Sequence, residues 1–299
     1  MTGGYSMTHS VTGNGTEDGH MPFDVHPLGE RSSGQFAIGE LLRVQAAQVP
    51  RSRWARLFGA SPIGVEGQPW FETAVGEVFV GELLAGLGDE WVVFHSVPVG
   101  VATGAPVGVN GADIDHLVIG PPGCFTITVR NHPGLDIAVS GRTVLVAGAK
   151  VSCVRDAEHN LGRAERLLSA ALGVVVTVTG LLVFVEPESL SSHDVPRDLE
   201  VLSSSELLPW LAAQPKILAT AEVERIGATA GRPEVWGDAA LAVDDNPSAI
   251  RDFERLRRSV VRSRMLRQLW FGVITILSIV TITAIATLAI LNLAPGRAH

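Results

Sequence analysis

Apolar positions between residues 68 and 215 follow two alternating periods, one near 3.6 residues and one of 2. The helical spacing predicts helices at 72–87 and 154–172, and a further helix that Ser205 caps and that ends at Ala212. Short β-branched runs bounded by turn residues predict strands at 91–99, 113–119, 124–130, 135–140, 142–147, 174–186 and 199–203. Since strands are framed by helices on both sides, the pattern indicates one α/β sandwich, with the apolar run 174–186 as an interior strand.

The most hydrophobic part of the chain is a run of 23 residues, Leu269 to Leu291, without a charged side chain. At about 1.5 Å per residue, a helix of this length spans the hydrocarbon layer of a bilayer, which is about 30 Å thick. Trp270 lies where an interfacial anchor is expected. A buried helix of a soluble protein is the alternative interpretation. We predict one transmembrane helix at 269–293.

Arginines cluster immediately before this run. Residues 251–267 contain seven arginines and two acids, whereas only Arg297 follows the run. The positive-inside rule then predicts a single-pass protein of the cell membrane, with a cytoplasmic N-terminal body and a short external tail at 294–299. The basic juxtamembrane helix at 251–268 is expected to lie near anionic lipid headgroups, from Arg251 to Arg267. Its simplest interpretation is a topology signal, and the two interpretations are compatible.

Charge and composition indicate which partners the N-terminal body can bind and how its first residues are organised. The chain has a formal charge of −8 and residues 251–299 carry +6, so residues 1–250 carry −14. Such a body is a poor match for non-specific binding to a polyanion. Residues 1–35 lack an apolar period and are predicted to be disordered, residues 36–67 to form a helical lead-in, and residues 216–250 a helical extension and linker.

Cysteines and sequence motifs exclude several classes of protein. Cys124 and Cys153 both fall in predicted strands and are expected to be reduced and buried, because the body is predicted to be cytoplasmic. Their spacing suggests neither a zinc site nor a redox motif. The sequence has no P-loop, no Gly-x-Gly-x-x-Gly after a strand, no Gly-x-Ser-x-Gly elbow and no His-Glu-x-x-His motif.

Candidate chemistry is concentrated in the segment GADIDHLVIGPPGCF, residues 111–125. Asp113 and Asp115 are two positions apart, so on a strand both point to the same face. A carboxylate at the start of a buried hairpin is costly to desolvate, and such groups are usually kept for a metal, a partner charge or catalysis. The alternative is that both acids lead a solvated turn into the strand. His116 points to the opposite face, where a hydrogen-bonded core histidine is expected.

Several motifs together resemble one known family. In chain order they are Gly76-Glu77, Trp91, His95, DIDHLVIGPPG, FTITVRNHPG and the run from Val174 to Glu186. They resemble the nuclease-related domain (NERD) of actinobacterial membrane proteins, over about residues 68–215. The resemblance implies a restriction-endonuclease-like fold of the PD-(D/E)xK type, with a central mixed β-sheet flanked by helices. It also implies cutting or binding of DNA.

The resemblance also implies a catalytic site. Glu77 would be its helix acid and Asp115 its strand acid, and the two would hold Mg²⁺, which prefers oxygen ligands. The acid-x-Lys pair of the family falls on Thr128 and Arg130, and both depart from that pattern. Arg130 cannot act as a base but can clamp a phosphate. We therefore expect weak or absent cleavage, and the alternative function is a non-catalytic membrane scaffold.

Two further side chains are candidates for substrate binding together with Thr128. His132 could reach a phosphate, although its place before Pro133 is also typical of a simple turn residue. Arg155 could line a phosphate groove, although an exposed helix arginine usually makes only a weak ion pair.

Overall fold

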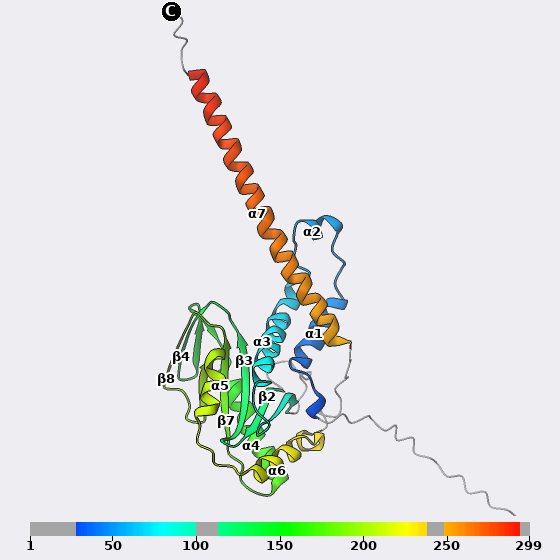
Figure 1. Cartoon of the computed structure of the whole chain (residues 1–299), viewed down its shortest axis with the longest axis vertical. Helices are drawn as coiled ribbons and strands as arrows, with labels where there is room; N and C mark the ends of the chain where they lie inside the picture. The colour runs from blue at the N-terminus through cyan, green and yellow to red at the C-terminus, as the bar shows by residue number, and fades with distance from the viewer. Residues whose placement is uncertain (1–27, 100–112, 238–247, 294–299) are drawn as a thin grey trace, which may run out of the picture.

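A computed structural model describes residues 28–99, 113–237 and 248–293 of the chain (Figure 1). At its centre lies a five-stranded mixed sheet with the strand order β1-β2-β3-β7-β9. These strands are β1 (Val92–Pro98), β2 (Asp113–Gly120), β3 (Gly123–Asn131), β7 (Val178–Val185) and β9 (Leu199–Ser203). β2 is antiparallel to β1 and β3, whereas β7 is parallel to both β3 and β9. The predicted mixed sheet between helices is confirmed.

Two pairs of helices cover the two faces of this sheet. α4 (Val154–Leu172) and α6 (Thr220–Ala230) share a buried cluster with Leu117 of β2. α3 (Gln68–Leu84) and α5 (Ser204–Ala213) share another with Val118, the next residue of the same strand. Alternate side chains of β2 therefore enter different cores, as the period of a strand requires.

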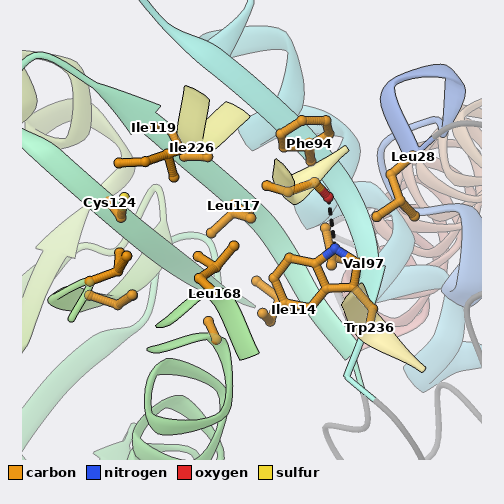
Figure 2. Packing of buried hydrophobic residues seen from close by; sticks show 14 of the residues in the cluster. Leu28, Phe94, Val97, Ile114, Leu117, Ile119, Cys124, Leu168, Ile226 and Trp236 are labelled. Carbon is orange, nitrogen blue, oxygen red and sulfur yellow. Dashed lines mark hydrogen bonds between the residues drawn. The ribbon is translucent and has the colours of Figure 1, made fainter. Parts of the chain in front are cut away.

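The first of these cores reaches back to the N-terminal part of the chain. Figure 2 shows Leu28 close to Val97 and Trp236, and all three side chains are fully buried. Leu28 belongs to η1 (Leu28–Glu30) and Trp236 to η3 (Pro233–Trp236). The guanidinium of Arg31 donates to the carbonyl oxygen of Ser96 at 3.1 Å. The predicted disorder of residues 1–35 is therefore wrong from Leu28 onward, because this segment fills a core; residues 1–27 lie outside the described ranges.

A second, four-stranded sheet stands beside the first, with the order β6-β5-β4-β8. Its strands are β4 (Asp136–Ser140), β5 (Thr143–Val146), β6 (Ala149–Val151) and β8 (Ser189–His193). The hairpin β4–β5 matches the predicted one, whereas β6 and β8 were not predicted. Ile137 and Val144 pack with Leu182 and Phe184 of β7. The sandwich thus has an additional small layer next to the end of the main sheet.

The lead-in segment and the C-terminal helix form a third packed region. α1 (Gln35–Ala46), α2 (Arg53–Leu57) and η2 (Val65–Gly67) precede α3. α7 (Ala249–Leu293) is one continuous helix of 45 residues. Its first half packs on α1 and α3 through Phe253 and Val260, and its second half projects alone (Figure 1). It is long and apolar enough to cross a membrane, and the most apolar window is fully exposed.

Several local boundaries differ from the sequence prediction, and α3 for example is Gln68–Leu84 and not 72–87. The N-cap of α5 is Ser203 and not Ser205, and its backbone N–H and its hydroxyl donate to the carboxylate of Glu206 at 2.9 and 2.7 Å. β7 begins at Val178 and not at 174, since Val175 before it is 85% exposed. Cys153 is the N-cap residue of α4 rather than part of a strand. Both cysteines are free and buried, as expected. Residues 100–112, between the predicted strands 91–99 and 113–119, lie outside the described residues.

Candidate functional site

The candidate site begins where β2 and β3 part. Their paired register ends at His116 opposite Ile127, although both strands continue beyond this point. In the gap, the backbone N–H of Val129 donates to Asp115 Oδ2 at 2.6 Å. A carboxylate thus replaces the backbone carbonyl that a neighbouring strand would supply. Asp113 and Asp115 are 7% and 8% exposed, so the solvated-turn interpretation is wrong.

Glu77 reaches the same region from α3. Its residue is 3% exposed, and among the described residues its Oε2 atom has no hydrogen-bond partner. The preceding Gly76 allows α3 to lie close against β3, because a Cβ atom there would be 2.7 Å from the Cβ of Asn131. The side-chain amide of Asn131 also donates to the carbonyl oxygen of Glu72 at 2.7 Å, which fixes the helix to the strand.

Electrostatics show that the three acids are neighbours. Burial raises the pKa of Glu77 well above its ordinary value, and the charges of Asp115 and Asp113 raise it further. Burial and then Asp115 raise the pKa of Asp113 to about 7. Burial raises the pKa of Asp115 to about 6, although Arg130 and the Val129 N–H lower it. Near neutral pH this cluster therefore holds protons that exposed carboxyl groups would release.

Arg130 supplies the positive charge of the cluster. It lowers the pKa of all three carboxyl groups. Its guanidinium Nη2 donates to Asp156 Oδ2 on α4 at 3.2 Å, and its Nη1 donates to the carbonyl oxygen of Val129 at 2.8 Å. The Arg130 side chain is 25% exposed. Thr128 is buried and lies two residues earlier on β3, so its side chain leaves the strand on the same side.

The remaining candidates occupy different positions. The ring of His132 stacks on Phe184 with centroids 6.4 Å apart, and burial and then Arg130 lower its pKa. It lies beside the cluster. Arg155 is exposed on α4, and no contact in the described part of the chain joins it to the acids. His116 is fully buried and its Nδ1 lies 2.8 Å from Nδ1 of His95. The expected hydrogen-bonded core histidine is confirmed.

Two members of the cluster were not predicted as site residues. Asp113 was noted only as the partner of Asp115 in the strand pattern, and its burial could not be read from that pattern. Asp156 lies 26 residues from Arg130 in sequence, in a helix whose polar residues gave no pairing signal. The resemblance had grouped Glu77, Asp115 and Arg130, and the spacing of Asp113 and Asp115 was a further indication of the larger cluster.

Comparison with known protein families identifies this region. Residues 72–185 match the family described as the nuclease-related domain, NERD. This chain contains a nuclease-related domain. A search of curated proteins and a search of solved structures found no match. The matched stretch runs from α3 to the end of β7 and includes every member of the acidic cluster and Arg130.

A nuclease-related domain implies a divalent metal ion, and the residues present can be tested for one. Within the described ranges, no group of three or more His, Cys, Asp and Glu side chains is placed to hold a metal. Mg²⁺, however, is usually held by one or two carboxylates, with waters and substrate phosphates completing its shell. Glu77 offers an unpartnered carboxylate oxygen beside Asp113 and Asp115, all with raised pKa. The donor chemistry of the domain therefore fits a hard divalent cation.

Proposed function

We propose that this chain is a membrane-tethered nuclease-related protein whose domain binds nucleic acid and cleaves it weakly or not at all. The observation that carries the proposal is the buried cluster of Glu77, Asp113 and Asp115 beside Arg130, inside the nuclease-related domain. Burying acids against one another is costly, and a fold retains such a cluster when a cation or catalysis uses it. A divalent cation, Mg²⁺ in this proposal, relieves that cost.

Each residue of the cluster has a role in this proposal. Glu77 and Asp115, with Asp113, hold the cation, which when bound would neutralise the phosphate and assist water ionisation. Arg130 binds a phosphate oxygen of the substrate. Thr128 and His132 line the approach of that phosphate. In this proposal Arg155 contacts the substrate only where the nucleic acid extends beyond the acidic cluster along α4.

Weak cleavage follows from the two departures on β3. Thr128 contributes no charge where the family pattern has an acid, so the cation has one ligand fewer. Arg130 stays protonated and cannot take a proton from water. It is also engaged by Asp156 at 3.2 Å, so a phosphate must compete with an existing partner. In this proposal the site therefore binds nucleic acid more effectively than it cleaves it.

A cleavage assay on the full chain in detergent or nanodiscs tests this function. Single- and double-stranded DNA and RNA are incubated with Mg²⁺ or Mn²⁺, and Asp115→Ala serves as the matched control. We expect nucleic-acid binding with little product. Rapid cleavage that Asp115→Ala abolishes contradicts the degenerate site, and cleavage that Asp115→Ala leaves unchanged comes from a contaminant. Absence of both binding and cleavage contradicts the nuclease-related function.

A second function, a non-catalytic membrane scaffold, is favoured by two observations. Asp115 accepts a hydrogen bond from the Val129 N–H, which is a structural use of that acid. Residues 1–250 carry −14, which opposes a polyanion. Salt dependence separates the two functions, since phosphate contacts make the logarithm of affinity fall linearly with the logarithm of salt concentration. A steep slope supports nucleic acid as the partner.

The tether and its orientation belong to the same proposal. We propose that α7 crosses the cell membrane over residues 269–293, that its arginines at 251–267 lie near anionic headgroups, and that the nuclease-related domain is cytoplasmic. The domain itself is proposed to span 68–215, beyond the matched residues, because β9 and α5 complete the sheet and one core. Protease added outside intact cells should leave the domain uncut. Digestion of the domain would contradict the cytoplasmic orientation and place it outside the cell.

A further inference from the structure

The short helix α2 carries an uncovered apolar face. Its three large apolar side chains, Trp54, Leu57 and the following Phe58, lie at i, i+3 and i+4 and therefore share one side of the helix. They are 70%, 48% and 50% exposed. The Oγ atom of Ser52 caps the helix by accepting from the backbone N–H of Ala55 at 3.1 Å. A helix of five residues with such a face needs a partner to cover it.

α2 is fixed against α7 at a defined place. The indole N–H of Trp270 donates to the carbonyl oxygen of Leu57 at 2.9 Å, and the rings of Trp270 and Phe58 are 5.0 Å apart. Gly59, with φ of +72°, allows this approach, because a Cβ atom there would lie 2.6 Å from the backbone of both Arg267 and Ser263. The contact is therefore backbone against backbone, and it holds α2 at one level of α7.

A second set of bonds reinforces this attachment. The guanidinium of Arg51 donates to Ser259 Oγ and to Ser263 Oγ, each at 3.3 Å. Ser259 and Ser263 are one helical turn apart on α7, so Arg51 spans that turn. Figure 1 shows α2 at the end of a loop that extends from the body along α7, toward the projecting half of that helix.

The level of this contact coincides with the end of the charged part of α7. Trp270 is the second residue of the charge-free run 269–291. In the proposed tether, this is where the helix enters the bilayer, so α2 lies at the membrane surface. Tryptophan and other aromatic side chains prefer that interface, because their rings are apolar and their polar groups remain hydrated. Trp54, Phe58 and Trp270 form a continuous aromatic row there.

Charge around α2 matches the same partner. Arg53 and Arg56 are exposed on α2, where Arg53 lies one turn before Leu57 at the edge of the apolar face, and Arg264 and Arg267 are exposed nearby on α7. Within the described residues, no ion pair involves any of these four arginines. An apolar face bordered by unpaired arginines is typical of helices that lie in the headgroup region of anionic bilayers.

We propose that α2 inserts its Trp54, Leu57 and Phe58 side chains into the headgroup region of the bilayer that α7 crosses. This inference rests on the proposed tether. The protein then meets the membrane at two points, and the second contact restricts how far α7 and the domain can tilt relative to the bilayer. The lead-in segment, whose role the sequence left open, thus sets the orientation of the nuclease-related domain relative to the membrane.

Depth-dependent quenching on the full chain tests the proposal. Single cysteines replace Leu57, Leu277 and Val175, and each carries an environment-sensitive fluorophore. Leu277 lies in the charge-free run and reports the tether. Val175, which is 85% exposed in the loop before β7, is the matched apolar control. The native cysteines interfere little, because both are buried and burial raises the pKa of the Cys124 thiol to about 12.

The labelled proteins are reconstituted into anionic vesicles with brominated acyl chains. We expect the emission at 57 and at 277 to be lost to quenching, with bromines about 5–10 Å below the headgroups most effective at 57, and no loss at 175. Adding Gly59→Val should reduce quenching at 57 and leave 277 unchanged. Quenching at 277 alone overturns the α2 contact and leaves the tether intact. A concentration-dependent blue shift at 57 without quenching assigns the face to a second copy and overturns the proposal. Absence of quenching at 277 contradicts both the membrane tether and the proposed insertion of α2.

Discussion

Replacing Asp113 by Asn removes one buried negative charge and keeps the side-chain volume. In the folded protein this carboxyl group stays protonated up to about pH 7, whereas its ordinary pKa is 3.8. Since the folded-state pKa is raised, the contribution to stability is complete below the unfolded pKa and is lost as the pH rises through about 7. The interval between the two values corresponds to about 4 kcal/mol, at about 1.4 kcal/mol per pH unit.

Asp115 loses its contribution over an overlapping interval, since its folded-state pKa is about 6. The two losses are not additive, because each charge raises the cost of the other. We therefore expect the unfolding free energy of the wild-type protein to fall by about 4 kcal/mol or more between pH 4 and pH 8, and that of Asp113→Asn to fall by about half as much. At pH 8 the variant should be the more stable protein.

The assay is urea unfolding of the full chain in detergent without divalent cations, followed by tryptophan fluorescence at several pH values. Glu82→Gln, an exposed acid on α3, controls for the loss of any one carboxylate. Its curve should parallel the wild type. If Asp113→Asn is equally or less stable than the wild type at pH 8, ionisation of the buried acids does not destabilise the folded protein as their raised pKa values indicate.

Three further outcomes can be measured. Adding Mg²⁺ or Mn²⁺ at pH 8 should raise the wild-type melting temperature and raise that of Asp115→Asn less, as calorimetry would show; equal gains place the cation elsewhere. Gly76→Ala should lower the unfolding free energy by about 1–3 kcal/mol because the added methyl meets β3, whereas Gly39→Ala, in open space on α1, should be neutral or stabilising by urea titration. The double variant Thr128→Asp, Arg130→Lys restores the acid-x-Lys pattern and should increase Mg²⁺-dependent cleavage at least about tenfold in a gel assay, since general base catalysis contributes about 10²–10⁴-fold; no increase means that these two residues do not limit the reaction.

Local patterns were sufficient to predict most of the main sheet. α4 begins and ends where its apolar spacing indicates, at Val154 and Leu172. The β2–β3 hairpin follows from two apolar runs around a Gly-Pro-Pro-Gly turn. These elements depend on side chains close in sequence, and local propensity and burial agree there.

Long-range pairing could not be predicted in the same way. β8 is short and almost entirely exposed, so it lacks the alternating pattern of a half-buried strand and forms only because β4 offers a parallel edge. Leu28 lies in a polar segment and is buried by residues as distant as Trp236. The ion pair between Arg130 and Asp156 depends on how α4 packs over β3. In each case the deciding contact lies far away in the sequence.

The charge balance of the cluster determines the order in which the proposed site can bind its partners. Arg130 pairs with Asp156 and lowers the pKa of Glu77, Asp113 and Asp115, so full ionisation of the four acids against this one arginine would leave three unbalanced negative charges. Raised pKa values show that protons bear part of that excess. We expect a phosphate to bind more readily once a cation has replaced those protons, because the phosphate itself adds negative charge. In the proposed function the cation therefore binds first. Nucleic-acid affinity should then increase with divalent cation at fixed ionic strength, opposite to the effect of screening alone.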